Sequence, residues 1–372
     1  MKNIQNIDVK GVVMKTFAML ASFYVMFLAF GVMKYSFTLL GGQWAEDLVK
    51  VSHNPFIYFF IGLLGAAVFQ SSSAVTTIVV GAVASGNMSL DDAVFIVMGA
   101  NIGTTVTSTI VALSYIDEKS VFMRALSGAA LHDFFNISVA LIFLPLELFT
   151  GFLSNLSQKI AFSINISDMA ISKNYFSNVG LGLDKLVKLL FSNLIDYPWG
   201  ILLIAILMIV GALKLIGGVT KQVLMEGKDF NRGEGFFFKN DAVALTTGTV
   251  LTSIVQSSSI TSSLIVPLTA TKKITLPRAY MFIMGANVGT TFTALFAAMA
   301  TGTEFGVEIA LTHFLFNFLG VLIFILIPGI RKVPIWYAKK LGFMAAKDRI
   351  FGFLYLFTLF FVVPFILVWI SL

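Results

Sequence analysis

The sequence Gln70-Ser71-Ser72-Ser73 interrupts an apolar run at residues 55–85, and Gln256-Ser257-Ser258-Ser259 interrupts a second run at residues 241–271. Each tetrapeptide is followed by a block of small and polar residues. The first block is Gly99-Ala100-Asn101-Ile102-Gly103-Thr104-Thr105 and the second is Gly285-Ala286-Asn287-Val288-Gly289-Thr290-Thr291. Gln70 and Gln256 are separated by 186 residues in sequence, and so are Gly99 and Gly285. The chain therefore contains one pair of polar motifs twice.

The composition indicates an integral membrane protein built from helices. Hydrophobic residues make up 58% of the chain, against about 45–50% in soluble domains, and charged residues make up only 12%. At a rise of roughly 1.5 Å per residue, neither half of an interrupted run crosses a hydrocarbon core of about 30 Å. Each run therefore predicts a re-entrant helical hairpin, whose polar tip must be buried in protein or line a wet cavity.

The predicted fold is an all-α membrane protein with two inverted-topology repeats, each with a re-entrant hairpin and a broken transmembrane helix. The first half makes three net crossings, so a linker that does not cross starts the second half on the opposite side, as is common in secondary transporters. The predicted segments are 1–146 (helix, hairpin 55–85, broken helix 92–114, helix 121–146), the extracytoplasmic linker 147–197, 198–328 (hairpin 241–271, broken helix 277–300), and 329–372 (interfacial basic segment and last transmembrane helix).

The basic residues predict the orientation of the chain in the bilayer. Most of the 25 Lys and Arg residues fall on one side if the N-terminus is cytoplasmic, as the positive-inside rule requires. The mouth of the first hairpin then opens outside and that of the second opens inside. The net charge of +6 is explained by this orientation, so the expected partner is the lipid bilayer and not a nucleic acid.

The polar motifs favour transport over catalysis. Neither tetrapeptide and neither block contains Lys or Arg, so hydroxyls, amides and freed backbone N–H groups are the donors for an oxyanion. The same motifs offer oxygens that suit sodium. The residues therefore predict cation-coupled transport of a small anion, with sodium supplying the positive charge.

An enzyme is not expected. The chain has three histidines and no cysteine, and no Ser–His–carboxylate set or metal-ligand spacing is visible. His132 and His313 occupy matching helices, and we interpret them as buried hydrogen-bonding residues that orient a neighbouring helix. No cofactor is expected apart from sodium as a coupling ion.

The paired motifs resemble those of type II sodium-dependent phosphate cotransporters. That family has a Gln-Ser-Ser-Ser in each half, a Gly-Ala/Ser-Asn-Ile/Val-Gly-Thr block after each, and a His-Asp-x-Phe-Asn helix, here His132-Asp133-Phe134-Phe135-Asn136. The resemblance covers roughly residues 56–145 and 242–342. It implies uptake of inorganic phosphate with sodium. The linker lacks the cysteines of animal members, which indicates a bacterial protein in the plasma (inner) membrane.

The resemblance also implies the site residues. Phosphate is expected at the two tips, bound by Gln70, Ser71, Ser72, Ser73, Gln256, Ser257, Ser258 and Ser259. Sodium is expected at Asn101, Thr104, Thr105, Glu118, Asn136, Asn287, Thr290, Thr291 and Thr293. The family has an acidic residue before the His-Asp helix, and either Asp117 or Glu118 corresponds to it.

Two alternatives remain open at this point. The donors of the tips also suit another small anion, such as sulfate or a dicarboxylate, because they are not specific to phosphate. A passive anion channel uses the same kinds of residues but does not accumulate its substrate.

Overall fold

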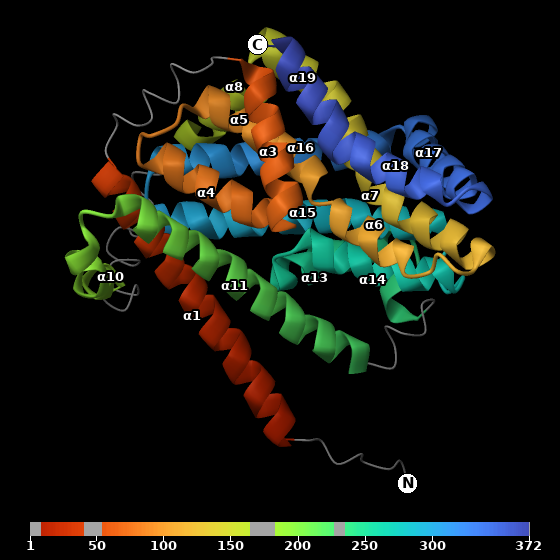
Figure 1. The fold of residues 1–372 in the computed structure, drawn as a ribbon, viewed down its shortest axis with the longest axis horizontal. Helices are drawn as coiled ribbons and strands as arrows, with labels where there is room; N and C mark the ends of the chain where they lie inside the picture. The colour runs from red at the N-terminus through yellow and green to blue at the C-terminus, as the bar shows by residue number, and fades with distance from the viewer. Residues whose placement is uncertain (1–8, 41–53, 164–182, 227–234, 372) are drawn as a thin grey trace.

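The computed structural model describes residues 9–40, 54–163, 183–226 and 235–371, and all regular secondary structure in these ranges is helical (Figure 1). Six helical stretches in these ranges are long and apolar enough to cross a membrane. The prediction of an all-helical, multi-pass membrane protein is therefore confirmed. The six candidate spans are Val13–Phe37, Leu90–Leu113, Lys119–Thr150, Pro198–Ile216, Leu276–Thr301 and Glu304–Leu326.

In chain order, the helices of the described ranges fall into two parts. The first part of the chain forms α1 (Val9–Leu40), α3 (Pro55–Phe69), α4 (Ser72–Ala84), α5 (Leu90–Gly103), α6 (Val106–Leu113), α7 (Lys119–Thr150) and α8 (Phe152–Ser163). The second part forms α10 (Leu183–Phe191), α11 (Pro198–Glu226), α13 (Asp241–Val255), α14 (Ser258–Ala270), α15 (Leu276–Thr301), α16 (Glu304–Leu326), α17 (Pro328–Lys347), α18 (Ile350–Phe357), the π-helical η4 (Thr358–Val362) and α19 (Val363–Ser371).

Each interrupted run forms two short helices that meet at the polar tetrapeptide. The helices before the tips, α3 and α13, have 15 residues each, and those after the tips, α4 and α14, have 13 each. An asparagine caps the start of each first helix, since Asn54 accepts from the Phe56 N–H and Asn240 accepts from the Val243 N–H. The two runs are thus built alike. Their re-entrant course in a bilayer and their inverted relation stay predictions.

Glycines allow the tip-bearing helices to pack closely in the same way in both parts of the chain. Helix α3 packs against α5, and α13 packs against α15. A Cβ atom at Gly99 would overlap the backbone carbonyl of Phe59, and one at Gly285 would overlap that of Leu245. The helix α5 that carries the first block is buried along most of its length. The blocks are therefore held at the centre by contacts that only glycine permits.

The first block breaks its helix as predicted, but the second does not. Helix α5 ends at Gly103 and α6 begins at Val106, whereas α15 is continuous from Leu276 to Thr301, so the prediction of a broken helix at 277–300 was wrong. The Asn136 side chain donates to the Asn101 carbonyl at 2.7 Å, and the Thr105 N–H bonds to the Ile102 carbonyl instead. Nothing in the described residues competes in this way for the Asn287 carbonyl. A side chain that enters the helical ladder interrupts it.

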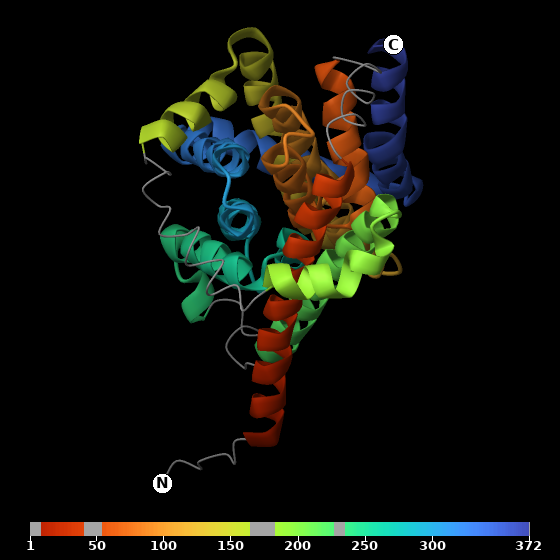
Figure 2. The ribbon, with the colours of Figure 1, turned by 90° about the vertical axis from the view of Figure 1, so that its left-hand side faces the viewer.

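Peripheral helices complete the fold. In Figure 1, α1 and α11 lie side by side, and α1 extends beyond the other helices in Figure 2 as well. Helix α8 packs against α16, and the basic α17 packs against α7. The predicted last transmembrane helix forms as three consecutive helical pieces, α18, η4 and α19. Its apolar stretch Ile350–Ile366 is shorter than the six candidate spans.

Some predictions fall on parts of the chain that the structure does not describe. Residues 164–182 of the linker 147–197 lie outside the described residues. The same holds for residues 1–8, 41–53 and 227–234.

The glycine contacts predict a measurable loss of stability. Gly99→Ala places a methyl group against the Phe59 carbonyl, and overpacking of this kind costs about 1–3 kcal/mol. We expect a lower Tm for the purified protein in detergent. Gly211→Ala in α11 is the matched control, because a Cβ there meets nothing within 4 Å, and it should leave the Tm unchanged or slightly higher. Equal Tm values for Gly99→Ala and wild type would contradict the packing argument.

Candidate functional site

A left-handed glutamine ends the first helix of each pair. Gln70 and Gln256 have φ values of 54° and 55°, and this conformation lets the chain turn from one helix directly into the next. The following serine then caps the second helix, since Ser71 Oγ accepts from the Ala74 N–H and Ser257 Oγ accepts from the Ile260 N–H. The motif Gln-Ser-Ser-Ser therefore encodes a helix end, a turn and a new helix start.

Each tip presents backbone donors without an internal acceptor. The first N–H groups of any helix lack an intrahelical partner. Within the described part of the chain, the N–H groups of Ser72 and Ser73 make no hydrogen bond, and the same is true of Ser258 and Ser259. Such N–H groups, at the positive end of a helix dipole, form a favourable site for an anion.

The two tips touch each other through reciprocal hydrogen bonds. Ser73 Oγ donates to the Gln256 carbonyl at 3.0 Å, and Ser259 Oγ donates to the Gln70 carbonyl at 3.0 Å. Ser259 Oγ also lies 3.2 Å from the carbonyl oxygen of Thr104, at the break between α5 and α6. Two motifs that are 186 residues apart in sequence thus form one continuous polar surface at the centre of the fold.

A second reciprocal pair joins the histidine helices to the blocks. His132 Nε2 on α7 lies 3.2 Å from Asn287 Oδ1, and His313 Nε2 on α16 lies 3.3 Å from Asn101 Oδ1. An amide oxygen only accepts, so each ring is placed as the tautomer with a proton on Nε2. Both rings are fully buried. The histidines orient the blocks across the two parts of the chain, as we had interpreted them.

Most residues predicted to bind sodium are brought together around this centre and are buried. These are Asn101, Thr104, Thr105, Asn136, Asn287, Thr290, Thr291 and Thr293. Several of the threonine hydroxyls donate to carbonyls of their own helices and keep their lone pairs for a ligand. The side-chain oxygens of Asn136, Asn317 and Thr293 are buried without a hydrogen-bond partner. Oxygens of this kind are the ligands that sodium requires.

Glu118 is the one predicted sodium residue that the structure does not bring to the centre. It is exposed and lies at the start of α7. His132 follows fourteen residues later on the same helix, about 20 Å along the axis. Asp117 is exposed in the same turn.

Asp133 is a central carboxylate that the site prediction missed. It is fully buried on α7, and Tyr355 of α18 donates its hydroxyl to Oδ2 at 2.7 Å. Its other oxygen, Oδ1, has no hydrogen-bond partner. A carboxylate within an apolar helix is a signal for function by itself, and His132-Asp133 was visible in the sequence.

The tips line a small cavity that also contains a basic side chain. The cavity holds about 140 Å³. Lys214, exposed on α11, lines it beside serines of both tips. The tetrapeptides and blocks themselves contain no Lys or Arg, as stated above, but the fold adds one from another helix. The lining residues are Phe69, Gln70, Ser71, Thr107, Val210, Leu213, Lys214, Ser257, Ser259 and Ile260.

Comparison with known proteins places this site in a family. Residues 25–157 and 202–356 match the family described as Na⁺/Pi-cotransporter. The chain belongs to this family. Its members are transporters, so the chain is a transport protein and not an enzyme. The two matched ranges contain both tetrapeptides, both blocks and both histidine helices, so the geometry described above belongs to the shared part of the family.

Individual relatives match over most of the chain. The sheep (Ovis aries) sodium-dependent phosphate transport protein 2A is 31% identical over 97% of this chain and 68% of its own length. The rat (Rattus norvegicus) 2A protein is 31% identical over 93% and 66%, and the human (Homo sapiens) 2B protein is 30% identical over 93% and 64%. The chain therefore spans about two thirds of the length of these relatives. No solved structure matches it.

Proposed function

We propose that this protein couples the uptake of inorganic phosphate to sodium ions by alternating access. The observation behind the proposal is the reciprocal contact of the two tips, in which Ser73 bonds to Gln256 and Ser259 bonds to Gln70. The contact gathers the unpaired N–H groups of two helix starts at one place. Family membership and the names of the relatives support sodium and phosphate as the substrates.

Phosphate binds between the tips in this proposal. Its oxygens accept from the free N–H groups of Ser72, Ser73, Ser258 and Ser259 and from the serine hydroxyls. Gln256 is 1% exposed, and both atoms of its side-chain amide lack a partner, so it is available to a ligand. Gln70 lies exposed at the other side of the contact. The eight residues of the two tetrapeptides act as one composite site.

Lys214 supplies part of the positive charge that the tips lack. Lys214 lines the cavity that Ser71, Ser257 and Ser259 also line. A lysine at the end of an anion site attracts phosphate as a point charge. Sodium bound nearby supplies the rest of the positive charge that the phosphate requires. Binding of the anion therefore depends on the cation.

Sodium binds at the blocks, next to the tips. The unpartnered side-chain oxygens of Asn136 and Thr293 are ligands in this proposal, together with the other buried residues of the predicted set. Asp133 replaces Glu118 as the carboxylate of the site, because it is buried on the same helix turn as His132 and keeps one free oxygen. A negative charge in an apolar region is stabilised by a cation.

Alternating access follows from an inverted relation of segments 1–146 and 198–328. The tip contacts and the histidine–asparagine contacts both occur as reciprocal pairs, which supports such a relation. The first hairpin then opens to the outside and the second to the cytoplasm of a bacterial cell, with a cytoplasmic N-terminus. Movement of one tip away from the other exposes the site to one side at a time.

The proposal predicts sodium-driven accumulation of phosphate. Proteoliposomes containing the purified protein should take up labelled phosphate above equilibrium with an inward sodium gradient, and not with an equal potassium gradient. Excess sulfate and succinate should not compete. Equal uptake with either cation would contradict sodium coupling, competition by sulfate would indicate another anion, and uptake that stops at equilibrium despite the gradient would indicate a passive channel.

The role of Lys214 predicts a chemical rescue, because the chain contains no cysteine. Lys214→Cys should raise the KM for phosphate about tenfold, since a hydrogen bond to a charged group contributes about 1.5–3 kcal/mol. Reaction with aminoethyl methanethiosulfonate restores a positive charge and should restore the KM.

The controls separate charge from shape. The neutral methyl methanethiosulfonate and the anionic sulfonatoethyl reagent should not rescue Lys214→Cys. Lys339→Cys, on the exposed face of α17, should keep the wild-type KM with every reagent. Rescue of Lys214→Cys by the neutral reagent would show that the side chain acts through its volume and not through its charge.

A further inference from the structure

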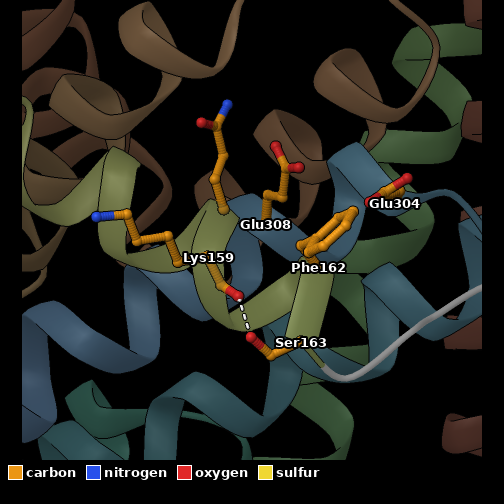
Figure 3. Close-up of a pocket in the computed structure, with 6 residues that line it drawn as sticks. Lys159, Phe162, Ser163, Glu304 and Glu308 are labelled. Carbon is orange, nitrogen blue, oxygen red and sulfur yellow. Dashed lines mark hydrogen bonds between the residues drawn. The ribbon is translucent and has the colours of Figure 1, made fainter.

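A second hollow, of about 570 Å³, lies where the end of α8 meets the start of α16 (Figure 3). It shares no lining residue with the cavity at the tips. Neither the sequence motifs nor the proposed transport site uses it. Its lining residues are Gln158, Lys159, Phe162, Ser163, Glu304 and Glu308.

Glu308 is a buried carboxylate whose side chain has no partner among the described residues. Its residue is only 6% exposed, although it lines the hollow. The oxygen Oε2 is shielded from solvent and makes no hydrogen bond, and no ion pair to Glu308 occurs among the described residues. A buried charge in this state is costly unless a cation or another donor compensates it. The described residues therefore provide no positive group to compensate the carboxylate at Glu308 Oε2.

The neighbouring charges do not provide that group. Glu304 lies one helical turn before Glu308 on the same face of α16, and like charges at this spacing repel. Figure 3 shows the ammonium end of Lys159 extending away from both carboxylates. Lys159 belongs to the exposed face of α8. The two carboxylates thus face the hollow without a matching cation from the described chain.

The possible cation ligands around the hollow are oxygen atoms, which suit a hard, monovalent cation. Besides the carboxylates, they are the amide oxygen of Gln158 and the hydroxyl of Ser163, which donates to the Lys159 carbonyl and keeps its lone pairs. No group of three or more His, Cys, Asp or Glu residues that suits a metal occurs among the described residues. Two Glu and one Lys leave one net negative charge, which a single monovalent ion neutralises.

We propose that this hollow binds a sodium ion, with Glu308 as its principal ligand and Glu304 as its second carboxylate. Sodium is a hard cation that prefers oxygen ligands. It is also the coupling ion in the description of the family to which the chain belongs. The site is separate from the sodium site proposed at the blocks, because it is formed by the ends of α8 and α16.

Helix α16 connects the hollow to the centre. The Glu308 carbonyl accepts from Thr312 Oγ1, which also lies 2.9 Å from Ser157 Oγ on α8. The next residue, His313, contacts Asn101. Five residues of helix, about 7.5 Å along the axis, therefore separate Glu308 from the histidine that orients the first block. A sodium ion at Glu308 stabilises the α8–α16 contact beside that histidine.

A single fluorophore tests the proposal in the full-length protein. Phe162→Cys places a unique thiol on the hollow, because the chain contains no other cysteine. The purified protein, labelled with an environment-sensitive dye, is titrated with sodium chloride against choline chloride at constant ionic strength without phosphate. We expect a saturable change with sodium alone. Glu308→Gln should raise the half-saturating concentration at least tenfold, and Glu304→Gln at least threefold.

The controls decide between the outcomes. Asp91→Asn, at an exposed acid on another helix, should shift the titration by less than twofold. A response that is unchanged in both Glu308→Gln and Glu304→Gln, or that potassium produces equally well, would overturn the proposal. If Glu308→Gln does not fold, the Glu304→Gln titration decides. The titration needs neither phosphate nor transport, so its failure is distinguishable from failure of sodium-driven phosphate uptake.

Discussion

The contact between the two helix tips is the constraint on which the rest of the structure depends. Ser73 and Ser259 each donate to the carbonyl of the glutamine that ends a helix in the other part of the chain. This is possible because Gln70 and Gln256 adopt the left-handed conformation, which turns their carbonyls out of the helical ladder. The helix starts that follow leave the N–H groups of Ser72, Ser73, Ser258 and Ser259 without a hydrogen bond among the described residues. The two tips therefore provide both the contact between the halves and the donors for an anion.

The centre is not fully symmetric, because a helix break, a buried carboxylate and a lysine each occur on one side only. The Asn136 amide takes the Asn101 carbonyl and breaks the helix between α5 and α6, whereas α15 stays continuous. The break places the Thr104 carbonyl beside Ser259, and no comparable contact forms at the second block among the described residues. The Tyr355–Asp133 bond and Lys214 add charged groups on one side only. The two sides of the polar centre therefore differ in helix continuity and in their charged groups.

The sequence predicted what local chemistry determines and missed what only tertiary contacts determine. The helix pairs around Gln70 and Gln256 follow from polar interruptions in apolar runs, as predicted. The close packing of α3 against α5 at Gly99 was not predicted. The continuity of α15 was not predictable, because both blocks have nearly the same sequence and a residue 35 positions away breaks only the first. Lys214 comes from a helix that carries no motif, and Glu118 lies far from the centre despite its place next to the histidine helix.

The central claim is that two tips form one phosphate site and that neither is sufficient alone. Equilibrium binding of labelled phosphate to the purified protein in sodium tests it directly, with Ser72→Ala and Ser258→Ala compared with wild type. The account predicts one phosphate per chain in wild type and at least tenfold weaker binding in each single variant. Two phosphates per chain, or a variant that keeps wild-type affinity for one phosphate, would contradict it.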